Sequence, residues 1–539
     1  MTRQHGGKIL AGRLALHGVG RVFSVPGESF LAALDGLYDH DIANIVCRQE
    51  GGAAMMAEAH GKMTGQPGVL FVTRGPGATN ASAGLHIAMH DATPMVCFVG
   101  QVPLKHRDRG VFQEVDYRAF FGPLVKWVAE VERTDRLAEY IDRAFAVAQA
   151  GRPGPVVLAL PEDILSAMAD APMTRPGARA TASVNPDDLA PFAEALKLAK
   201  RPLILCGGSQ WSDTDRQGAE ALAERLGAPI AVTFRRQHYI DNDHPNYAGD
   251  LGVGANPALG KRLSQSDCIL LLGAELNDIT TADFTLLDPA DPPTILQVTP
   301  EAEAASKTYP ATFAVTGSPG SMLYQLSEML PPTTADRGAS EARAEFEAWQ
   351  VPQPTPGDVQ MEAVIGWLRD NASPDTIITN GAGNYAAFLH RYYRFRRFGT
   401  QVAPTSGSMG YGLPAAISAK LQNPDQPVIC LAGDGCLQMT IQELSTARQY
   451  GADITVIVAN NGRYGTIRMH QEKQYPGRVS GTDLFNPDYA ALARAYGGTG
   501  HVVTANAQLA QAYAQALTGG LHIIELKLDP TMLSTTKSL

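Results

Sequence analysis

The sequence predicts an α/β protein made of three doubly wound domains, each with a parallel sheet. Apolar strand-like runs alternate with helical patterns along the whole chain. The chain has 539 residues, too many for one hydrophobic core, and usual domain sizes give about three domains. Proline-rich polar stretches at 171–187 and 331–358 are typical joints. We therefore expect domains at 1–180, 181–340 and 341–539.

Two segments repeat the same order of elements. In residues 68–100 and again in 427–461, an apolar strand ends in a Gly-x-Gly turn, a helix follows, and a second strand begins. This repetition indicates that the first and third domains are related. The region between them has its own strand-then-glycine signals at 201–209 and 267–275, which predict a further parallel sheet.

Composition and charge narrow the range of partners. The formal net charge is −10 and no basic stripe is present, which argues against nucleic-acid binding. No run of 18 apolar residues occurs, and the N-terminus lacks a signal-peptide pattern, so we expect no membrane partner and a cytoplasmic location.

The cysteine pattern predicts free thiols rather than disulfides or zinc ligands. The six cysteines form no C-x-x-C pair, which points to a reduced compartment. Four of them lie in or beside apolar strand-like runs, where burial is expected: Cys97, Cys206, Cys268 and Cys430.

The most specific chemistry lies between residues 433 and 461. Asp434 stands where a strand ends and a helix begins, so its carboxylate can hold a hard cation, and the amides of Gly435 and Cys436 can face phosphate oxygens. Asn461 falls at the end of the neighbouring strand. With a backbone carbonyl, a water and two phosphate oxygens, these side chains would complete an octahedral Mg²⁺ site. Gly-Asp-Gly alone also makes ordinary turns, but the flanking strands and paired asparagines favour the metal site.

This segment resembles the thiamine-diphosphate motif, a GDG followed by NN, here after 24 residues. The resemblance implies that Mg²⁺ is bound by Asp434, Asn461 and the backbone carbonyl of Arg463. The cofactor-binding residues that it implies are Pro26, Gly27, Glu50, Asn80, Gly383, Asn384, Gly407, Met409, Gly433, Asp434, Gly435, Cys436, Asn461 and Tyr464.

Glu50 is the expected activating carboxylate. A glutamate that opens a helix is ordinarily only a favourable first-turn charge, but RQEGGAA resembles the segment in which the family's glutamate hydrogen-bonds the cofactor's pyrimidine nitrogen. Gly407 matches the carbonyl that receives the aminopyrimidine, and Met409 matches the bulky residue that bends the cofactor, although methionine is more often core filler. In this family Glu50 and Asp434 of one site come from different subunits. A homodimer or homotetramer with active sites at the subunit interface is therefore implied.

Within the family, nearly the whole chain resembles acetolactate synthase catalytic chains. Phe112–Glu114 matches their AFQE segment, in which Gln113 would help to place the bound intermediate. Lys126 follows Glu114 by 12 residues, as a family lysine does, although such exposed residues usually only solvate a surface. Arg468 is a further candidate for contact with substrate oxygens. The predicted catalytic residues are Glu50, Gln113, Lys126 and Arg468.

Departures from the biosynthetic enzymes are also visible. His470 stands where they carry a tryptophan, and Gln49 stands where they carry a histidine. The central region lacks the segments that accompany FAD there, so FAD is not expected. The paired histidines of pyruvate decarboxylases are not evident, since His106 stands alone. His86 and His90 are spaced like a helical metal pair but lack a third ligand, and we interpret them as ordinary helix histidines.

The prediction is a thiamine-diphosphate- and Mg²⁺-dependent transferase, a carboligase that decarboxylates pyruvate or a related 2-oxo acid and joins the acyl unit to a second carbonyl. A lyase that decarboxylates a 2-oxo acid and releases an aldehyde remains open. So do a cofactor-binding chain without turnover, and oxidase or acyl-CoA-using relatives. Fold and motif alone do not choose among these substrates.

Overall fold

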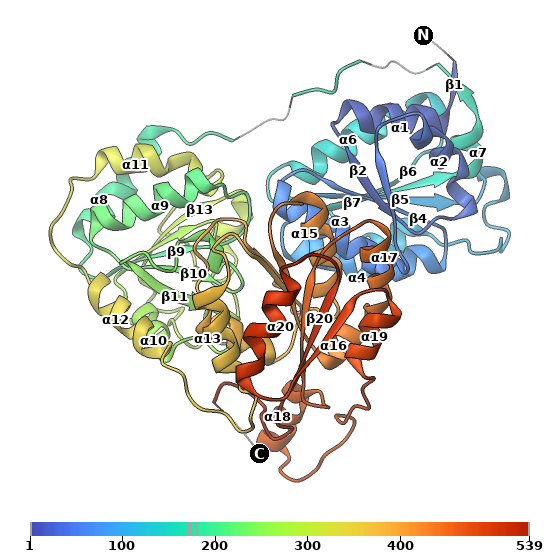
Figure 1. Ribbon diagram of the computed structural model, residues 1–539. Coiled ribbons are helices and arrows are strands. Elements are labelled where there is room, and N and C mark those ends of the chain that lie inside the picture. Colours follow the sequence, from blue (N-terminus) through green and yellow to red (C-terminus); the bar gives the residue numbers. More distant parts are fainter. Residues whose placement is uncertain (1–2, 171–173, 179–181, 537–539) are drawn as a thin grey trace.

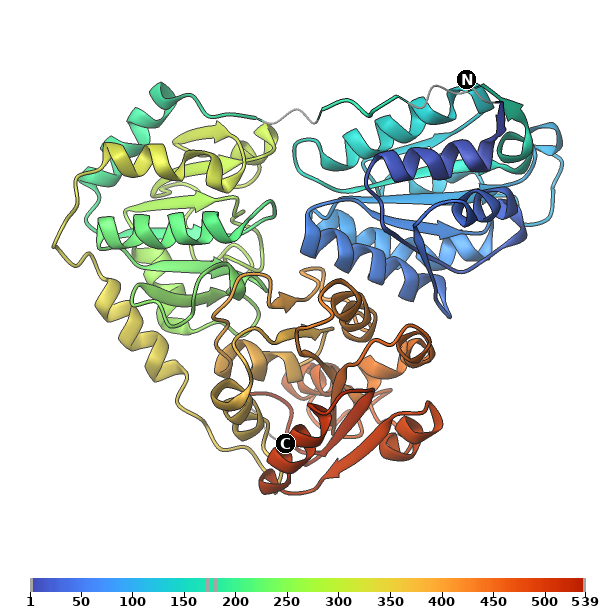
Figure 2. The ribbon, with the colours of Figure 1, turned by 45° about the horizontal axis from the view of Figure 1, so that its top comes forward.

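The computed structural model describes residues 3–170, 174–178 and 182–536. Three six-stranded parallel sheets lie in three separate domains, as the sequence predicts (Figures 1 and 2). The polypeptide between the sheets spans residues 162–201 and 317–376, which contain the two expected boundaries. Of the first predicted joint, 171–173 and 179–181 lie outside the described residues.

The N-terminal sheet has the strand order β3-β2-β4-β5-β7-β6. Its strands are β2 (Arg21–Ser24), β3 (Ala43–Val46), β4 (Gly68–Val72), β5 (Met95–Gln101), β6 (Trp127–Glu130) and β7 (Pro155–Pro161). Its helices are α1 (Gly6–Leu16), α2 (Leu31–Tyr38), α3 (Glu50–Thr64), α4 (Pro76–His90), α5 (Tyr117–Phe121), α6 (Leu137–Gln149) and α7 (Glu162–Ser166). A short antiparallel pair joins β1 (Gln4–His5) to β8 (Met168–Ala169).

The central sheet has the order β11-β10-β9-β12-β13-β14, with its switch point between β9 and β12. Its strands are β9 (Pro202–Cys206), β10 (Ile230–Thr233), β11 (Tyr247–Leu251), β12 (Cys268–Leu272), β13 (Thr294–Thr299) and β14 (Phe313–Thr316). Its helices are α8 (Ala190–Leu198), α9 (Asp213–Leu226), α10 (Pro257–Gln265) and α11 (Leu323–Met329). Helix α12 (Ala339–Trp349) lies in the connection to the third domain (Figure 2).

The C-terminal sheet has the order β16-β15-β17-β18-β20-β19. Its strands are β15 (Ile377–Asn380), β16 (Gln401–Val402), β17 (Val428–Gly433), β18 (Thr455–Asn460), β19 (Thr499–Val503) and β20 (His522–Lys527). Its helices are α13 (Met361–Asn371), α14 (Tyr385–Tyr392), α15 (Gly412–Gln422), α16 (Asp434–Gln438), α17 (Leu444–Gln449), α18 (Gly465–Gln474), α19 (Tyr489–Ala495) and α20 (Leu509–Ala516).

The first and third sheets share one topology. When the six strands of each sheet are numbered in chain order, both sheets have the spatial order 2-1-3-4-6-5. The predicted relation between the two domains is therefore confirmed in strand order. One detail differs from the expectation. The single helix expected after Asp434 is divided into α16, a 3-10 turn at Ile441–Glu443 and α17. The division follows from Thr440, which leaves helical backbone geometry and donates its hydroxyl to the carbonyl of Gly410, 2.7 Å away.

A shared core joins these two domains. Leu70 and Val72 alternate with Val69 and Phe71 along β4, so the two pairs face opposite sides of the sheet. The first pair packs with α3 and α4 and the second with α1, α2 and α6. The core on the α3 side continues into α15 and the third sheet, and α15 lies beside α3 (Figure 1). Both domains thereby pack against one layer of helices.

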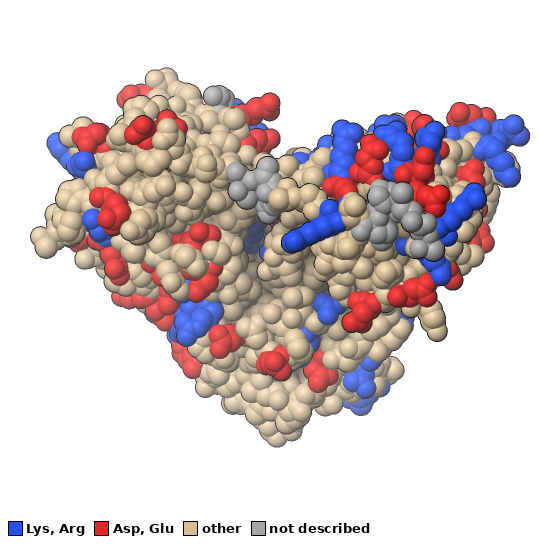
Figure 3. Space-filling model, turned by 90° about the horizontal axis from the view of Figure 1, so that it is seen from above, with Lys and Arg blue, Asp and Glu red and all other residues tan. Residues whose placement is uncertain are grey.

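The cysteine prediction is confirmed, and the surface carries charges of both signs. Acidic and basic side chains are interspersed on the face shown in Figure 3, which has no continuous basic band. Within the described residues, no helix combines the length and the apolar character needed to cross a bilayer. All six cysteines are free and buried, as expected.

Candidate active site

A cavity of about 250 Å³ opens at the carboxyl ends of the strands of the third sheet. It collects residues from the ends of β15, β17 and β18, which is where ligands bind in such sheets. Ten of the predicted cofactor-binding residues line it: Gly383, Asn384, Gly407, Met409, Gly433, Asp434, Gly435, Cys436, Asn461 and Tyr464. Arg463, the predicted source of a metal-binding carbonyl, lines it as well.

Asp434 is the carboxylate of this cavity. It is 3% exposed, because it stands where β17 runs into α16. Its Oδ1 accepts the amide of Gly435 at 2.8 Å, and its Oδ2 accepts the amide of Gly462 at 2.8 Å and the side-chain amide of Asn486 at 2.7 Å. Burial raises the pKa of Asp434, and these hydrogen bonds act in the opposite direction by favouring the carboxylate. The carboxylate is thus held in a fixed orientation beside the cavity.

Asn486 is a contributor that the sequence reasoning missed. It lies between α18 and α19, outside the motif, and no spacing marks it. Its side-chain amide also donates to Oδ1 of Asn460 at 2.8 Å, so it links the carboxylate to the end of β18. Tyr489 adds a hydroxyl bond to the carbonyl of Asp434 at 3.2 Å.

The paired asparagines have different environments. Asn461 lines the cavity, with its Oδ1 accepting the amide of Arg463 at 3.3 Å and its Nδ2 donating to the carbonyl of Met532 at 3.4 Å. Asn460 is directed to Glu525, whose Oε1 accepts its Nδ2 at 2.6 Å. Only the second asparagine therefore offers an oxygen toward a ligand in the cavity.

The shape and donors of the cavity suit thiamine diphosphate with Mg²⁺. Gly407 has φ +68°, and nothing lies within 4 Å of where a side chain would begin, so a ligand can approach its backbone. At Gly435 a Cβ would stand 2.5 Å from the ring of Tyr464, and at Gly433 one would stand 2.9 Å from Tyr385. One buried carboxylate and one amide oxygen are oxygen donors of the kind Mg²⁺ takes when phosphates complete its shell. The residues present fit both groups.

The remaining predicted cofactor residues gather at the edge of the N-terminal sheet. Glu50 opens α3, as predicted, and its Oε2 accepts the side-chain amide of Asn80 at 3.0 Å. Gly27 follows β2 and packs against Thr73, while Pro26 precedes it on the exposed surface. None of these residues lines the cavity around Asp434. One chain therefore presents two separate sets of site residues.

Glu443 links the two sets, and the sequence reasoning did not identify it. This fully buried carboxylate of the C-terminal domain accepts the amides of Arg48 at 3.1 Å and Gln49 at 3.0 Å, and the hydroxyl of Thr446 at 2.6 Å. Burial raises its pKa. A Cβ at Gly52 would stand 2.7 Å from the same carboxylate, which explains why this position has no side chain. The chain leading to Glu50 is thus anchored on the other domain.

The three further candidates for catalysis lie outside the cavity. Gln113 has φ +64° and packs against Gly75. Lys126 donates its Nζ to the carbonyls of Val147 at 2.7 Å and Ala150 at 2.6 Å, and burial lowers its pKa. Arg468 is 8% exposed and forms an ion pair with Glu472. Their roles stay predictions.

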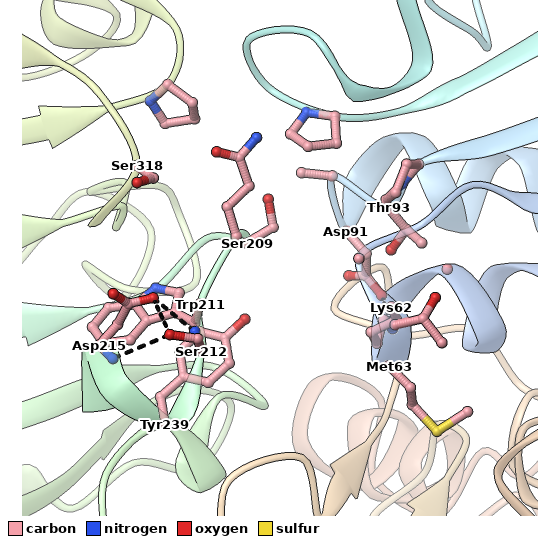
Figure 4. Close-up of a pocket in the computed structure, with 18 of the residues that line it drawn as sticks. Lys62, Met63, Asp91, Thr93, Ser209, Trp211, Ser212, Asp215, Tyr239 and Ser318 are labelled. Atoms are coloured by element: carbon pink, nitrogen blue, oxygen red, sulfur yellow. Dashed lines mark hydrogen bonds and ion pairs between the residues drawn. The ribbon is translucent and has the colours of Figure 1, made fainter. Parts of the chain in front are cut away.

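Two other cavities lie where the domains meet. One, of about 480 Å³, lies between Lys62 and Asp91 of the N-terminal domain and Trp211 and Tyr239 of the central domain (Figure 4). It includes none of the predicted site residues. A larger one, of about 780 Å³, is lined in part by Lys126.

The histidine pair and the search for metal clusters add no further site. The rings of His86 and His90 lie 4.5 Å apart on α4. Within the described part of the chain, no group of three or more histidine, cysteine or acidic side chains is arranged to hold a metal. A Mg²⁺ site with a single carboxylate does not depend on such a group.

Family models identify the class of protein. Residues 4–120 match the N-terminal TPP binding domain of thiamine pyrophosphate enzymes, 189–326 match the central domain, and 381–526 match the C-terminal TPP binding domain. The chain therefore belongs to the thiamine pyrophosphate (thiamine diphosphate) enzyme family, as the sequence resemblance predicted.

Individual relatives refine this assignment. The acetolactate synthase isozyme 3 large subunit of Escherichia coli is 31% identical, over 98% of this chain and 96% of that protein. The acetolactate synthase large subunit of Parasynechococcus marenigrum is 31% identical, over 95% and 85%. A solved structure, the thiamine diphosphate-dependent 4-hydroxybenzoylformate decarboxylase of Rhodococcus jostii RHA1, superposes with a TM-score of 0.86 at 26% identity, over 98% of this chain and 99% of that one. The chain is an acetolactate synthase-like enzyme.

Proposed function

We propose that the enzyme is a Mg²⁺-dependent carboligase of the acetolactate synthase type. It decarboxylates pyruvate and joins the acyl unit to a second carbonyl, which gives 2-acetolactate when the acceptor is pyruvate. The observation that carries this proposal is the similarity to acetolactate synthase large subunits along 95–98% of the chain. The cavity around Asp434 supports it with donors that suit the cofactor and its metal.

In this proposal the C-terminal domain binds the cofactor's charged end. Asp434, the side chain of Asn461 and the carbonyl of Arg463 would hold Mg²⁺, and the amides of Gly435 and Cys436 at the start of α16 would bind the diphosphate. Thiamine diphosphate, when bound, supplies the nucleophilic carbon and the electron sink for decarboxylation.

Glu50 supplies the carboxylate that would share a proton with the cofactor. Asn80 orients it by donating to Oε2, which leaves Oε1 to hold a proton against a ring nitrogen of the cofactor. Because the Glu50 set and the Asp434 set do not line one cavity within the chain, we propose that each site combines them from two subunits. The active form is then a homodimer or a homotetramer with sites at the subunit interface. FAD has no part in this reaction, so the purified protein is expected to lack flavin absorbance.

A second candidate is the simple decarboxylase, in which a proton takes the place of the acceptor carbonyl. The structural match to a 4-hydroxybenzoylformate decarboxylase over 98% of the chain favours it. The two candidates share the cofactor, the metal and Glu50. They differ in the product and in the size of the 2-oxo acid.

Product analysis separates them. Purified protein is incubated with thiamine diphosphate, Mg²⁺ and either pyruvate or benzoylformate, while CO₂, 2-acetolactate and free aldehyde are measured. A Glu50→Gln variant serves as the control. The proposal expects 2-acetolactate from pyruvate and almost none from the control. Aldehyde alone would establish the decarboxylase, and equal rates in both proteins would refute the role of Glu50.

A further inference from the structure

Two adjacent arginines in the turn after β10, Arg235 and Arg236, contact the two other domains. Arg236 lies with its Nη2 3.8 Å from Oδ1 of Asp91 in the N-terminal domain. Arg235 reaches into the C-terminal domain, where its Nη1 donates to the carbonyl of Pro404 at 2.5 Å and its Nη2 to that of Gly381 at 2.7 Å. Among the contacts between the central and C-terminal domains, this one guanidinium bonds two separate loops of the C-terminal domain.

Both carbonyls belong to loops that form the cofactor cavity. Gly381 follows β15 and begins the loop 381–384, and Pro404 lies in the loop 403–409 that follows β16. The carbonyl of Pro404 also accepts the amide of Gly407 at 3.2 Å. Arg235 and Gly407, the residue expected to meet the aminopyrimidine, therefore donate to the same carbonyl oxygen.

The Gly381 side of this contact leads to the diphosphate end of the cavity. The amide of Gly381 donates to the hydroxyl of Tyr385 at 3.1 Å, and that hydroxyl donates to Sγ of Cys436 at 3.3 Å. Cys436 Sγ also accepts the amide of Gly410 at 3.2 Å. The guanidinium thus lies behind the cavity wall and is linked to both loops and to α16.

The conformation of Arg235 is costly. The residue is 3% exposed and has φ +59°, a left-handed backbone that side chains other than glycine rarely adopt. Burial lowers the pKa of its guanidinium to about 10. In the described part of the chain no carboxylate forms an ion pair with it, and its Nε has no hydrogen-bond partner. An ordinary core position needs neither a buried cation without a counter-ion nor a left-handed backbone.

We propose that Arg235 is a positioning residue for the thiamine diphosphate site. It holds the loops 381–384 and 403–409 at the separation that the cofactor needs, and it makes cofactor affinity depend on the docked central domain. Because the cofactor enters through the proposed function, this inference rests on that function. Arg235 touches neither cofactor nor substrate, so its effect appears in cofactor binding.

The experiment compares Arg235→Met and Arg235→Lys with the matched control Arg343→Met. Arg343 also bonds two backbone carbonyls, those of Asn242 at 2.7 Å and His244 at 3.2 Å, but it lies away from the cavity. The full-length proteins are titrated calorimetrically with thiamine diphosphate in saturating Mg²⁺. The melting temperature without cofactor and the KM for pyruvate at saturating cofactor are measured in parallel.

Arg235→Met is expected to weaken cofactor binding about tenfold or more, because two charge-assisted hydrogen bonds to the loops are lost. Arg235→Lys is expected to fall between this variant and the parent, since an ammonium lacks the bidentate fork. Arg343→Met keeps the parent affinity, and the KM for pyruvate does not change.

Parent-like affinity in both Arg235 variants would overturn the inference. The inference would also be overturned if Arg343→Met lost cofactor affinity as well, with the loss in every variant following its drop in melting temperature. If Arg235→Met fails to fold, Arg235→Lys decides alone. A parent protein that does not bind thiamine diphosphate would remove the proposed function and this inference with it, whereas parent binding with unaffected variants removes only the inference.

Discussion

Replacing Asn486 with alanine tests the orientation of the metal-binding carboxylate. Asn486 donates to Oδ2 of Asp434 at 2.7 Å, and Asp434 is 3% exposed, so water replaces the lost bond poorly. A hydrogen bond to a charged group is worth about 1.5–3 kcal/mol, which corresponds to a roughly tenfold to hundredfold loss of Mg²⁺ affinity. The loss also favours the protonated form of Asp434, whose pKa burial already raises, and protonation opposes metal binding.

The assay titrates Mg²⁺ into metal-free protein at fixed excess thiamine diphosphate, following CO₂ release from pyruvate and the rise in melting temperature. Asn506→Ala is the matched control, because Asn506 lies in the same domain but accepts the amide of Gln360 at 2.9 Å. The Asn486 variant is expected to need more Mg²⁺ than the parent and to reach a similar rate at saturation. An unchanged Mg²⁺ requirement would refute the reasoning that Asn486 orients Asp434.

Three further predictions concern the cavity, the domain contact and pH. Gly435→Ala places a Cβ 2.5 Å from the ring of Tyr464, which lines the cavity and must shift, so cofactor binding measured calorimetrically is expected to weaken; unchanged binding would contradict this. Glu443→Ala removes the acceptor of the partly buried amides of Arg48 and Gln49 and is expected to lower the melting temperature more than Glu443→Gln, which keeps an acceptor; equal effects would contradict it. Burial lowers the pKa of His238 and of His390 to about 3, so their stabilisation is complete above the unfolded value of about 6.5. As pH falls from about 6.5 toward 3, the unfolded chain binds protons that the folded protein does not, so the free energy of unfolding falls by about 1.4 kcal/mol per pH unit for each histidine. A melting temperature that stays flat from pH 6.5 to 4 would exclude this.

The sequence predicted the fold and the position of Asp434 between a strand and a helix, because these depend on local order. Strand, Gly-Asp-Gly and helix around Asp434 are consecutive in the chain, and parallel sheets place strand ends at one edge. Local order also predicted that Glu50 opens a helix, whereas the roles of Glu50 and Asn80 came only from the family resemblance. Periodicity and turn chemistry are sufficient for such elements.

Contacts between distant segments could not be predicted in this way. Asn486, Glu443 and Arg235 act through partners in other loops or domains, and each would pass for an ordinary polar residue in its local sequence. The division of the helix after Asp434 has the same origin, since Thr440 bonds a carbonyl in the loop before α15. Arg468, a candidate for contact with substrate oxygens, forms an ion pair with Glu472 in its own helix, and its role stays a prediction.

A working site is proposed to join Glu50 of one subunit to Asp434 of another. Glu50→Gln and Asp434→Asn chains are co-expressed with different tags, the mixed dimers are isolated by both tags, and CO₂ release from pyruvate is measured. The account predicts that each variant alone is inactive and that the isolated mixed dimer, with one intact site of two, shows about half the parent rate. An inactive mixed dimer that still binds thiamine diphosphate would contradict it.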